Sequence, residues 1–180
     1  MKSFSDKLCW AFVFVIVLAL AVSLSFLKGA GANALHPTVE RSEQLQEKMR
    51  ALITWIAANS DYGEVEPPVV VFMGKEPMNY LFYFGRYTGQ ETVQALYFPG
   101  YENNGGVIFL REDFDLDRDE HILVHELVHH MQFRHRKKAP CLQALEREAY
   151  GIQAIWVKQT GRGDMPSPFF MFLLRCEGEQ

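Results

Sequence analysis

Apolar residues set out three helical stretches along the chain. In residues 36–60 and 141–159 they recur every three to four positions, the spacing of one face of a helix. Between these two stretches, residues 118–133 form an apolar run with no proline or glycine to interrupt a helical turn. The pattern therefore predicts three helices, the first one separated from the other two by about sixty residues.

The intervening segment carries signals for strands. Residues 69–73 are a run of valines with Phe and Met, which is typical of a buried strand. Residues 92–98 and 107–110 read as a pair of strands, because the segment between them is rich in Pro, Gly and Asn. Residues 78–84 are apolar and aromatic, and their periodicity does not decide between helix and strand. We expect an α+β domain in which a short antiparallel sheet packs on the helix at 118–133.

The first 34 residues differ from the rest of the chain. Lys2 and Lys7 precede an uncharged run, residues 8–27, and the small-residue stretch that follows ends in Ala-Asn-Ala at 32–34. A positive start, an apolar run and an A-x-A site are the parts of a secretory signal. The run is longer than a usual signal core, so an uncleaved signal anchor stays open as the alternative. Either way, residues 35–180 are expected to form one exported domain, periplasmic or extracellular, with residues 8–27 as its only membrane contact if they are retained.

The charge balance argues against nucleic acid as a partner. The formal net charge is −4 at pH 7, and the segment 1–34 holds three lysines but only one aspartate, so the remainder is more acidic still. Nucleic-acid binding needs a basic face to meet the phosphates. We therefore expect no nucleic-acid partner.

The cysteines fit an exported domain. Cys9 lies inside the apolar run, which leaves Cys141 and Cys176 as an even pair. Such pairs commonly form disulfides in oxidising compartments, the alternative being two free buried thiols. We favour a Cys141–Cys176 disulfide, which would tie the start of the last long helix to the C-terminal tail. That tail includes an apolar piece, residues 169–174, which we expect to cover the core.

The chemistry centres on His125-Glu126-Leu127-Val128-His129, within the predicted helix at 118–133. Residues four apart lie on one face of a helix, so His125 and His129 can bind one metal ion while Glu126 projects beside them. Two neutral imidazoles as ligands and a carboxylate free to take a proton from water are what metal-assisted hydrolysis requires. His121 is a further possible ligand, although an exposed histidine in the first turn of the helix explains it better.

A catalytic zinc site usually has three protein ligands and one open position. The next predicted helix offers Glu146 and Glu148, which lie about 200° apart around a helical axis. Glu146 shares its face with the small residue Ala149, which would let two helices approach closely. This favours Glu146 as the third ligand and leaves Glu148 as the competing candidate.

His125-Glu126-x-x-His129 followed by Glu146-x-Glu148-Ala149 resembles the gluzincin zinc metallopeptidases, in particular the short HtpX/Ste24-type and ImmA/IrrE-type families. The resemblance covers roughly residues 107–153, and Tyr150 departs from it where the HtpX/Ste24-type families have Asp. It implies a zincin-like fold, Glu146 as the third zinc ligand and Glu126 as general base. It also implies that the strand before the metal helix, residues 107–110, forms the edge of the cleft.

We therefore expect a zinc-dependent metallopeptidase of the gluzincin type, in which Glu126 takes a proton from a zinc-activated water that attacks a peptide bond. Its substrate would be a peptide or protein. The alternative is a zinc-binding scaffold or binding protein without catalysis, which the intact Glu126 argues against. The donor that stabilises the oxyanion is left open among Tyr150, His135 and His130.

Overall fold

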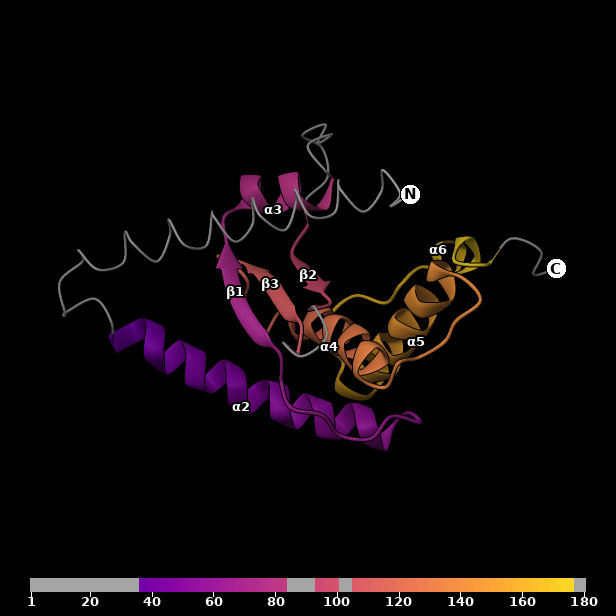
Figure 1. The fold of residues 1–180 in the computed structure, drawn as a ribbon, viewed down its shortest axis with the longest axis horizontal. Coiled ribbons are helices and arrows are strands. Elements are labelled where there is room, and N and C mark those ends of the chain that lie inside the picture. The colour runs from indigo at the N-terminus through magenta and orange to yellow at the C-terminus, as the bar shows by residue number, and fades with distance from the viewer. Residues whose placement is uncertain (1–35, 84–92, 101–104, 177–180) are drawn as a thin grey trace, which may run out of the picture. The chain divides into compact units, whose positions relative to one another are not determined.

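The computed structural model describes residues 36–83, 93–100 and 105–176 (Figure 1). The chain separates into two compact units, residues 1–43 and 44–180, and of the first only the start of one helix is described. The predicted export segment, residues 1–34 with its apolar run 8–27, lies outside the described residues. Within the described part, none of the helices combines the length and the apolar character needed to cross a membrane.

The second unit contains a three-stranded mixed sheet, so the domain is of the α+β class as predicted. The strands are β1 (Val69–Met73), β2 (Ala95–Phe98) and β3 (Val107–Arg111), in the order β1-β3-β2. β2 pairs antiparallel with β3, as the turn-rich segment between them indicated. β1, however, pairs parallel with β3, with Val69 opposite Val107, so the expectation of a wholly antiparallel sheet was wrong.

The strand order also changes which strand borders the cleft. β3, residues 107–111, is the central strand, flanked on both sides, and β2 is the edge strand that contacts the metal helix. The expectation that residues 107–110 form the edge of the cleft was therefore wrong. The cause is the position of β2, which pairs with β3 on one side and contacts α4, while β1 covers the other side of β3.

In the described part of the chain, five helices accompany the sheet (Figure 1): α2 (His36–Ala58), α3 (Lys75–Phe82), α4 (Glu120–Arg134), α5 (Leu142–Thr160) and α6 (Pro168–Leu173). α2, α4 and α5 lie where the apolar periodicity predicts them. α3 resolves the ambiguity at residues 78–84 in favour of a helix, which begins earlier, in the turn at Lys75.

α4 is the central helix of the core. Eleven of its fifteen residues are buried, so it is covered on nearly all sides rather than along one stripe. The core brings together one face each of α2, α4 and α5 with the inner side chains of β3: Leu45, Met49, Leu52, Ile53, Ile56, Ile108, Leu110, Leu123, Val124, Leu127, Val128, Met131, Ala149 and Ile152. A helix held in this way fixes the direction of its polar side chains, which matters for the site below.

α4 and α5 pack against each other in opposite directions. Gln132 near the end of α4 bonds Leu145 near the start of α5, whereas His125, two turns earlier in α4, stacks on Tyr150, further along α5. Residues later in α4 thus contact residues earlier in α5, so the two helices are antiparallel. Ala149, which is fully buried, lies in this contact, as its small size suggested.

The predicted disulfide between Cys141 and Cys176 is present. It joins the N-cap residue of α5 to the segment that follows α6. α6 does not cover the core, because none of its residues is buried and Phe169 is 72% exposed. Instead, the Phe170 ring lies 5.0 Å from the ring of Tyr150 on α5.

Candidate metal centre

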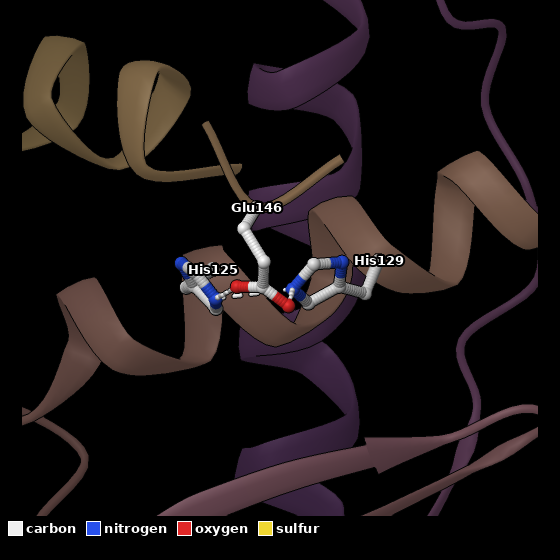
Figure 2. Close-up of side chains that lie close together, drawn as sticks. All are labelled: His125, His129 and Glu146. Carbon is white, nitrogen blue, oxygen red and sulfur yellow. Dashed lines mark hydrogen bonds and ion pairs between the residues drawn. The ribbon is translucent and has the colours of Figure 1, made fainter. Parts of the chain in front are cut away.

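His125, His129 and Glu146 converge at the contact between α4 and α5, with the Glu146 carboxylate between the two imidazole rings (Figure 2). The Nε2 atoms of the two histidines are 3.1 Å apart. Each lies 3.4 Å from one oxygen of the carboxylate, His125 from Oε2 and His129 from Oε1. The three residues that sequence reasoning selected are therefore brought together.

These distances fit a metal ion. Ligand atoms held about 2.0–2.1 Å from a tetrahedral centre lie roughly 3.3 Å from one another. The observed separations of 3.1–3.4 Å are close to that spacing, with one carboxylate oxygen of Glu146 near each histidine. Two imidazole nitrogens and one carboxylate oxygen also form a donor set that binds divalent transition metals. The three side chains can thus hold a metal ion.

The electrostatics of the cluster favour a positive charge at its centre. Burial opposes ionisation of Glu146, but the bonds from His125 and His129 outweigh it and hold the pKa of this carboxyl below its ordinary value. Burial likewise opposes protonation of His129, yet the hydrogen bond to Glu146 and the charge of Glu126 raise its pKa. The surroundings thus stabilise a cation between these side chains, and a bound metal ion would supply it.

Gln132 orients one of the ligands. Its side-chain oxygen lies 2.9 Å from Nδ1 of His129 and can accept a hydrogen bond from it, an arrangement in which Nε2 of a neutral imidazole is left to bind a metal ion. Its amide nitrogen donates to the Leu145 carbonyl and to Oε2 of Glu148, 3.0 Å from each. Glu148 also accepts a hydrogen bond from the Tyr62 hydroxyl. Glu148 thus lies outside the group of possible ligands, and its carboxylate instead bonds Gln132, the residue that contacts His129.

Glu126 lies beside the cluster and outside the set of ligand atoms. It is only 7% exposed, and one of its carboxylate oxygens accepts a 2.6 Å hydrogen bond from the backbone N–H of Tyr97 on the edge strand β2. Burial raises the pKa of Glu126, while the neighbouring His125 and His129 act against that rise. A carboxylate with a raised pKa is a stronger proton acceptor when it is ionised.

An open cavity of about 1010 Å³ adjoins the cluster. Its walls include His125, Glu126, His129 and Glu146, together with β2 and the side chains of Phe82 and Phe170. Most of the lining is apolar or aromatic, with a few polar groups at the metal cluster, as is typical of a ligand-binding cleft. The cluster is thus accessible to a molecule larger than water.

The candidate oxyanion donors and His121 differ in whether they line the cavity. Tyr150 lines the cavity, with its ring 4.1 Å from that of His125, whereas His130 bonds the Glu66 carbonyl and His135 bonds the Gly63 carbonyl. Of the three candidate oxyanion donors, only Tyr150 faces the site. His121 is 8% exposed, so it is buried rather than exposed as expected, and it lies outside the cluster.

Two residues of the site were not identified from the sequence. Gln132 follows His129 by three positions, so its place on the same helix face is visible in the sequence, and that spacing was the available signal. Tyr97 acts through its backbone, twenty-nine positions from Glu126. No residue type marks such a contact.

Comparison with known proteins gives one family. Residues 41–165 match the model of a family described as "Domain of unknown function (DUF6647)", and this range includes every residue of the cluster. Neither the search of curated proteins nor the search of solved structures gave a match.

Proposed function

We propose that this protein is a zinc-dependent metallopeptidase. The chain belongs to the DUF6647 family, whose function is unknown. The observation that carries the proposal is the position of Glu126. It lies next to three side chains that can hold a metal ion, is outside that donor set, and lines the same cavity. A site that only stored a metal would have no use for a buried carboxylate held in this way.

The donor set supports zinc as the metal. His125, His129 and Glu146 are two histidines and one glutamate. This is the ligand set of many catalytic zinc sites, in which the fourth position stays open for water. When bound there, zinc would act as a Lewis acid that lowers the pKa of water and polarises a carbonyl oxygen.

The side chains of this protein would handle the proton. Glu126 accepts a proton from the water molecule as the water oxygen attacks the carbonyl carbon of a peptide bond. The same carboxyl then gives the proton to the amide nitrogen as the carbon–nitrogen bond breaks. The Tyr97 N–H holds one of its oxygens in place through both transfers.

Tyr150 is the best-placed residue to donate a hydrogen bond to the developing oxyanion. Burial, followed by the charges of Glu146 and Glu126, raises the pKa of its hydroxyl, so the group keeps its proton at neutral pH. Its ring contacts His125, so the side chain is held at the metal cluster.

We propose that the enzyme acts outside the cytosol on peptides or proteins. The Cys141–Cys176 disulfide supports this location, because such bonds persist in oxidising compartments.

The test combines metal content with hydrolysis, both measured on the full chain loaded with zinc. Glu126→Gln should keep about one zinc per chain and cleave a randomised peptide library roughly 10²–10⁴-fold more slowly than the wild type. His125→Ala and Glu146→Ala should lose the metal as well as the activity. Glu47→Gln, an exposed glutamate on α2, is the matched control and should change neither quantity.

Two outcomes would contradict the proposal. A folded wild type that binds no zinc would remove the metal site. A zinc-loaded wild type that cleaves no peptide would instead favour the zinc-binding scaffold.

A further inference from the structure

The cavity follows one face of α4 for most of the length of the helix. The residues that α4 and its C-terminal turn contribute are spaced three or four apart, or are neighbours on that face: Ile122, His125, Glu126, His129, Gln132, Phe133 and Arg136. Arg136 lies seven residues beyond His129, which corresponds to about 10 Å along a helical axis. The metal cluster thus lies part-way along a groove whose far end is Arg136.

The two ends of this groove differ in chemistry. Toward the start of α4, the rings of Tyr150 and Phe170 follow one another beside His125, with centroids 5.0 Å apart. Toward the end of α4, Arg136 and Lys137 line the cavity. These two belong to an unbroken basic run, residues 134–138, in a chain whose net charge is −4. The groove is therefore aromatic on one side of His125, His129 and Glu146 and cationic on the other.

At the cationic end of the groove, Lys137 and Arg136 differ in whether a described residue pairs with them. Lys137 lies 3.3 Å from a carboxylate oxygen of Glu148. The Arg136 guanidinium, which is exposed, forms no hydrogen bond or ion pair with the residues that the structure describes. It is available to a molecule in the groove.

The backbone of Arg136 adds an independent observation. Its φ of 51° is positive, a conformation that no other non-glycine residue in the described chain adopts. It closes α4 with the paired bonds of a Schellman cap, from Arg136 N–H to the Phe133 carbonyl and from Lys137 N–H to the Gln132 carbonyl. Glycine is the usual residue at this place, because a side chain there is strained. Strained residues gather at functional sites, where the side chain has a use.

The helix dipole alone does not account for an arginine here. A cation near the C-terminal end of a helix is favourable, but Arg134 already supplies one in the last turn of α4. Glycine at position 136 would adopt the positive φ without strain. Arg136 lines the groove, and its side chain is what distinguishes arginine from glycine at this position.

We propose that Arg136 forms an anion subsite that binds a carboxylate of the substrate, so that the enzyme acts on acidic peptides. The guanidinium fork pairs with a carboxylate through two hydrogen bonds. An extended peptide advances about 3.3 Å per residue, so the carboxylate lies roughly three residues from the bond at the metal cluster. The proposal rests on the proposed peptidase function, whose substrate class it specifies. The carboxylate comes from an Asp or Glu side chain or from the C-terminus of the peptide.

The experiment measures binding, so it does not depend on hydrolysis. Zinc-loaded Glu126→Gln protein is immobilised and exposed to randomised peptide libraries at low salt, one with free C-termini and one with amidated C-termini. Peptides with Asp or Glu should be enriched roughly tenfold over matched peptides with Asn or Gln, and added salt should reduce the enrichment. Enrichment in the amidated library assigns the carboxylate to a side chain; a preference for free C-termini alone assigns it to the end of the peptide.

Variants in the same Glu126→Gln background locate the subsite. Arg136→Gln should abolish the enrichment, and Arg136→Lys should retain part of it, because the charge remains while the fork is lost. Lys138→Gln is the matched control: it removes one charge from the same basic run at a residue outside the cavity, and the enrichment should persist. Equal retention of acidic and neutral peptides, or enrichment that survives Arg136→Gln, would overturn the proposal.

Arg136→Gly separates this role from a structural one. Glycine relieves the strain of the positive φ, so the melting temperature should rise while the enrichment disappears. A lower melting temperature would mean that Arg136 supports the fold, and would count against the subsite. Hydrolysis by the protein with Glu126 intact then tests the proposed function separately. Bound peptides that remain uncut contradict the peptidase, whereas peptides cut without acidic preference contradict the subsite.

Discussion

Gln132 is the residue that links the metal cluster to the rest of the fold. Its side chain touches His129 on its own helix and both Leu145 and Glu148 on α5. A single amide therefore bonds one possible metal ligand and spans the contact between α4 and α5, the helices that carry all three possible ligands.

Removing this amide should weaken metal binding without unfolding the protein. We expect Gln132→Ala to lower the zinc affinity about 10–100-fold, the usual effect of losing a partner that orients a metal ligand. Competition with a chromophoric chelator measures the affinity. Gln143→Ala, an exposed glutamine on α5, is the control and should leave it unchanged. An unaltered affinity in Gln132→Ala would show that the imidazole is oriented by packing alone.

At this scale, much of the candidate site was predictable because it is local. The spacing of His125 and His129 places both on one helix face, and the angle between Glu146 and Glu148 distinguishes them as ligand and support. The part that escaped prediction depends on contacts between distant segments. The Tyr97 N–H reaches Glu126 only because β2 pairs beside α4, and apolar periodicity does not encode which strands pair.

At the scale of the helix, the start of α4 depends on Asp119. This residue occupies the N-cap position, but its carboxylate does not bond the helix N–H groups. It accepts hydrogen bonds from the Arg118 guanidinium and from the Asp115 N–H instead. The bonds from Arg118, together with that from the backbone of Asp115, hold the pKa of the Asp119 carboxyl below its ordinary value.

This arrangement predicts a pH-dependent stability. A lowered pKa in the folded state stabilises the fold above the ordinary pKa of an aspartate, and the stabilisation is lost as the pH falls through the lowered value. Asp119→Asn should reduce the free energy of unfolding by about 0.5–1 kcal/mol at pH 7, a small effect because Arg118 is mostly exposed. The difference from the wild type should shrink below about pH 4.

Urea denaturation at pH 7 and at pH 3 measures this difference. Asp164→Asn, in the exposed loop after α5, should leave the midpoint unchanged at pH 7. A deficit of equal size at both pH values would contradict the role of the Asp119 charge.

The longer helices were easier to predict from the sequence than the shorter one. α2, α4 and α5 span 15 to 23 residues, long enough for the period of 3.6 to be recognised. α3 spans only 8 residues, and so short an apolar run is compatible with either helix or strand. The parallel pairing of β1 with β3 had no local signal, because it joins segments nearly forty residues apart.

At the scale of the whole molecule, the disulfide closes a loop that makes up about a quarter of the domain. It joins Cys141 to Cys176 across 35 residues, a loop that contains α5 and α6. Removing it should reduce the free energy of unfolding by about 3–4 kcal/mol, since a cross-link over a loop of this length restricts the unfolded chain. Urea denaturation of the Cys141→Ser/Cys176→Ser double variant measures the loss.

The control is the wild type under reducing conditions, whose denaturation midpoint should approach that of the double variant. If both proteins unfold at the urea concentration of the oxidised wild type, the bond does not stabilise the fold.

If the proposed peptidase activity is correct, the same bond has a further consequence. The segment 161–167 between α5 and α6 is largely exposed and lies inside the loop that the disulfide closes. If one copy of the protein cleaved another within this segment, the disulfide would keep the two fragments covalently joined. The fragment with α5, which carries Glu146, would stay linked to the fragment with α6. Self-digestion at this point would therefore leave an intact molecule on a non-reducing gel and two pieces on a reducing one.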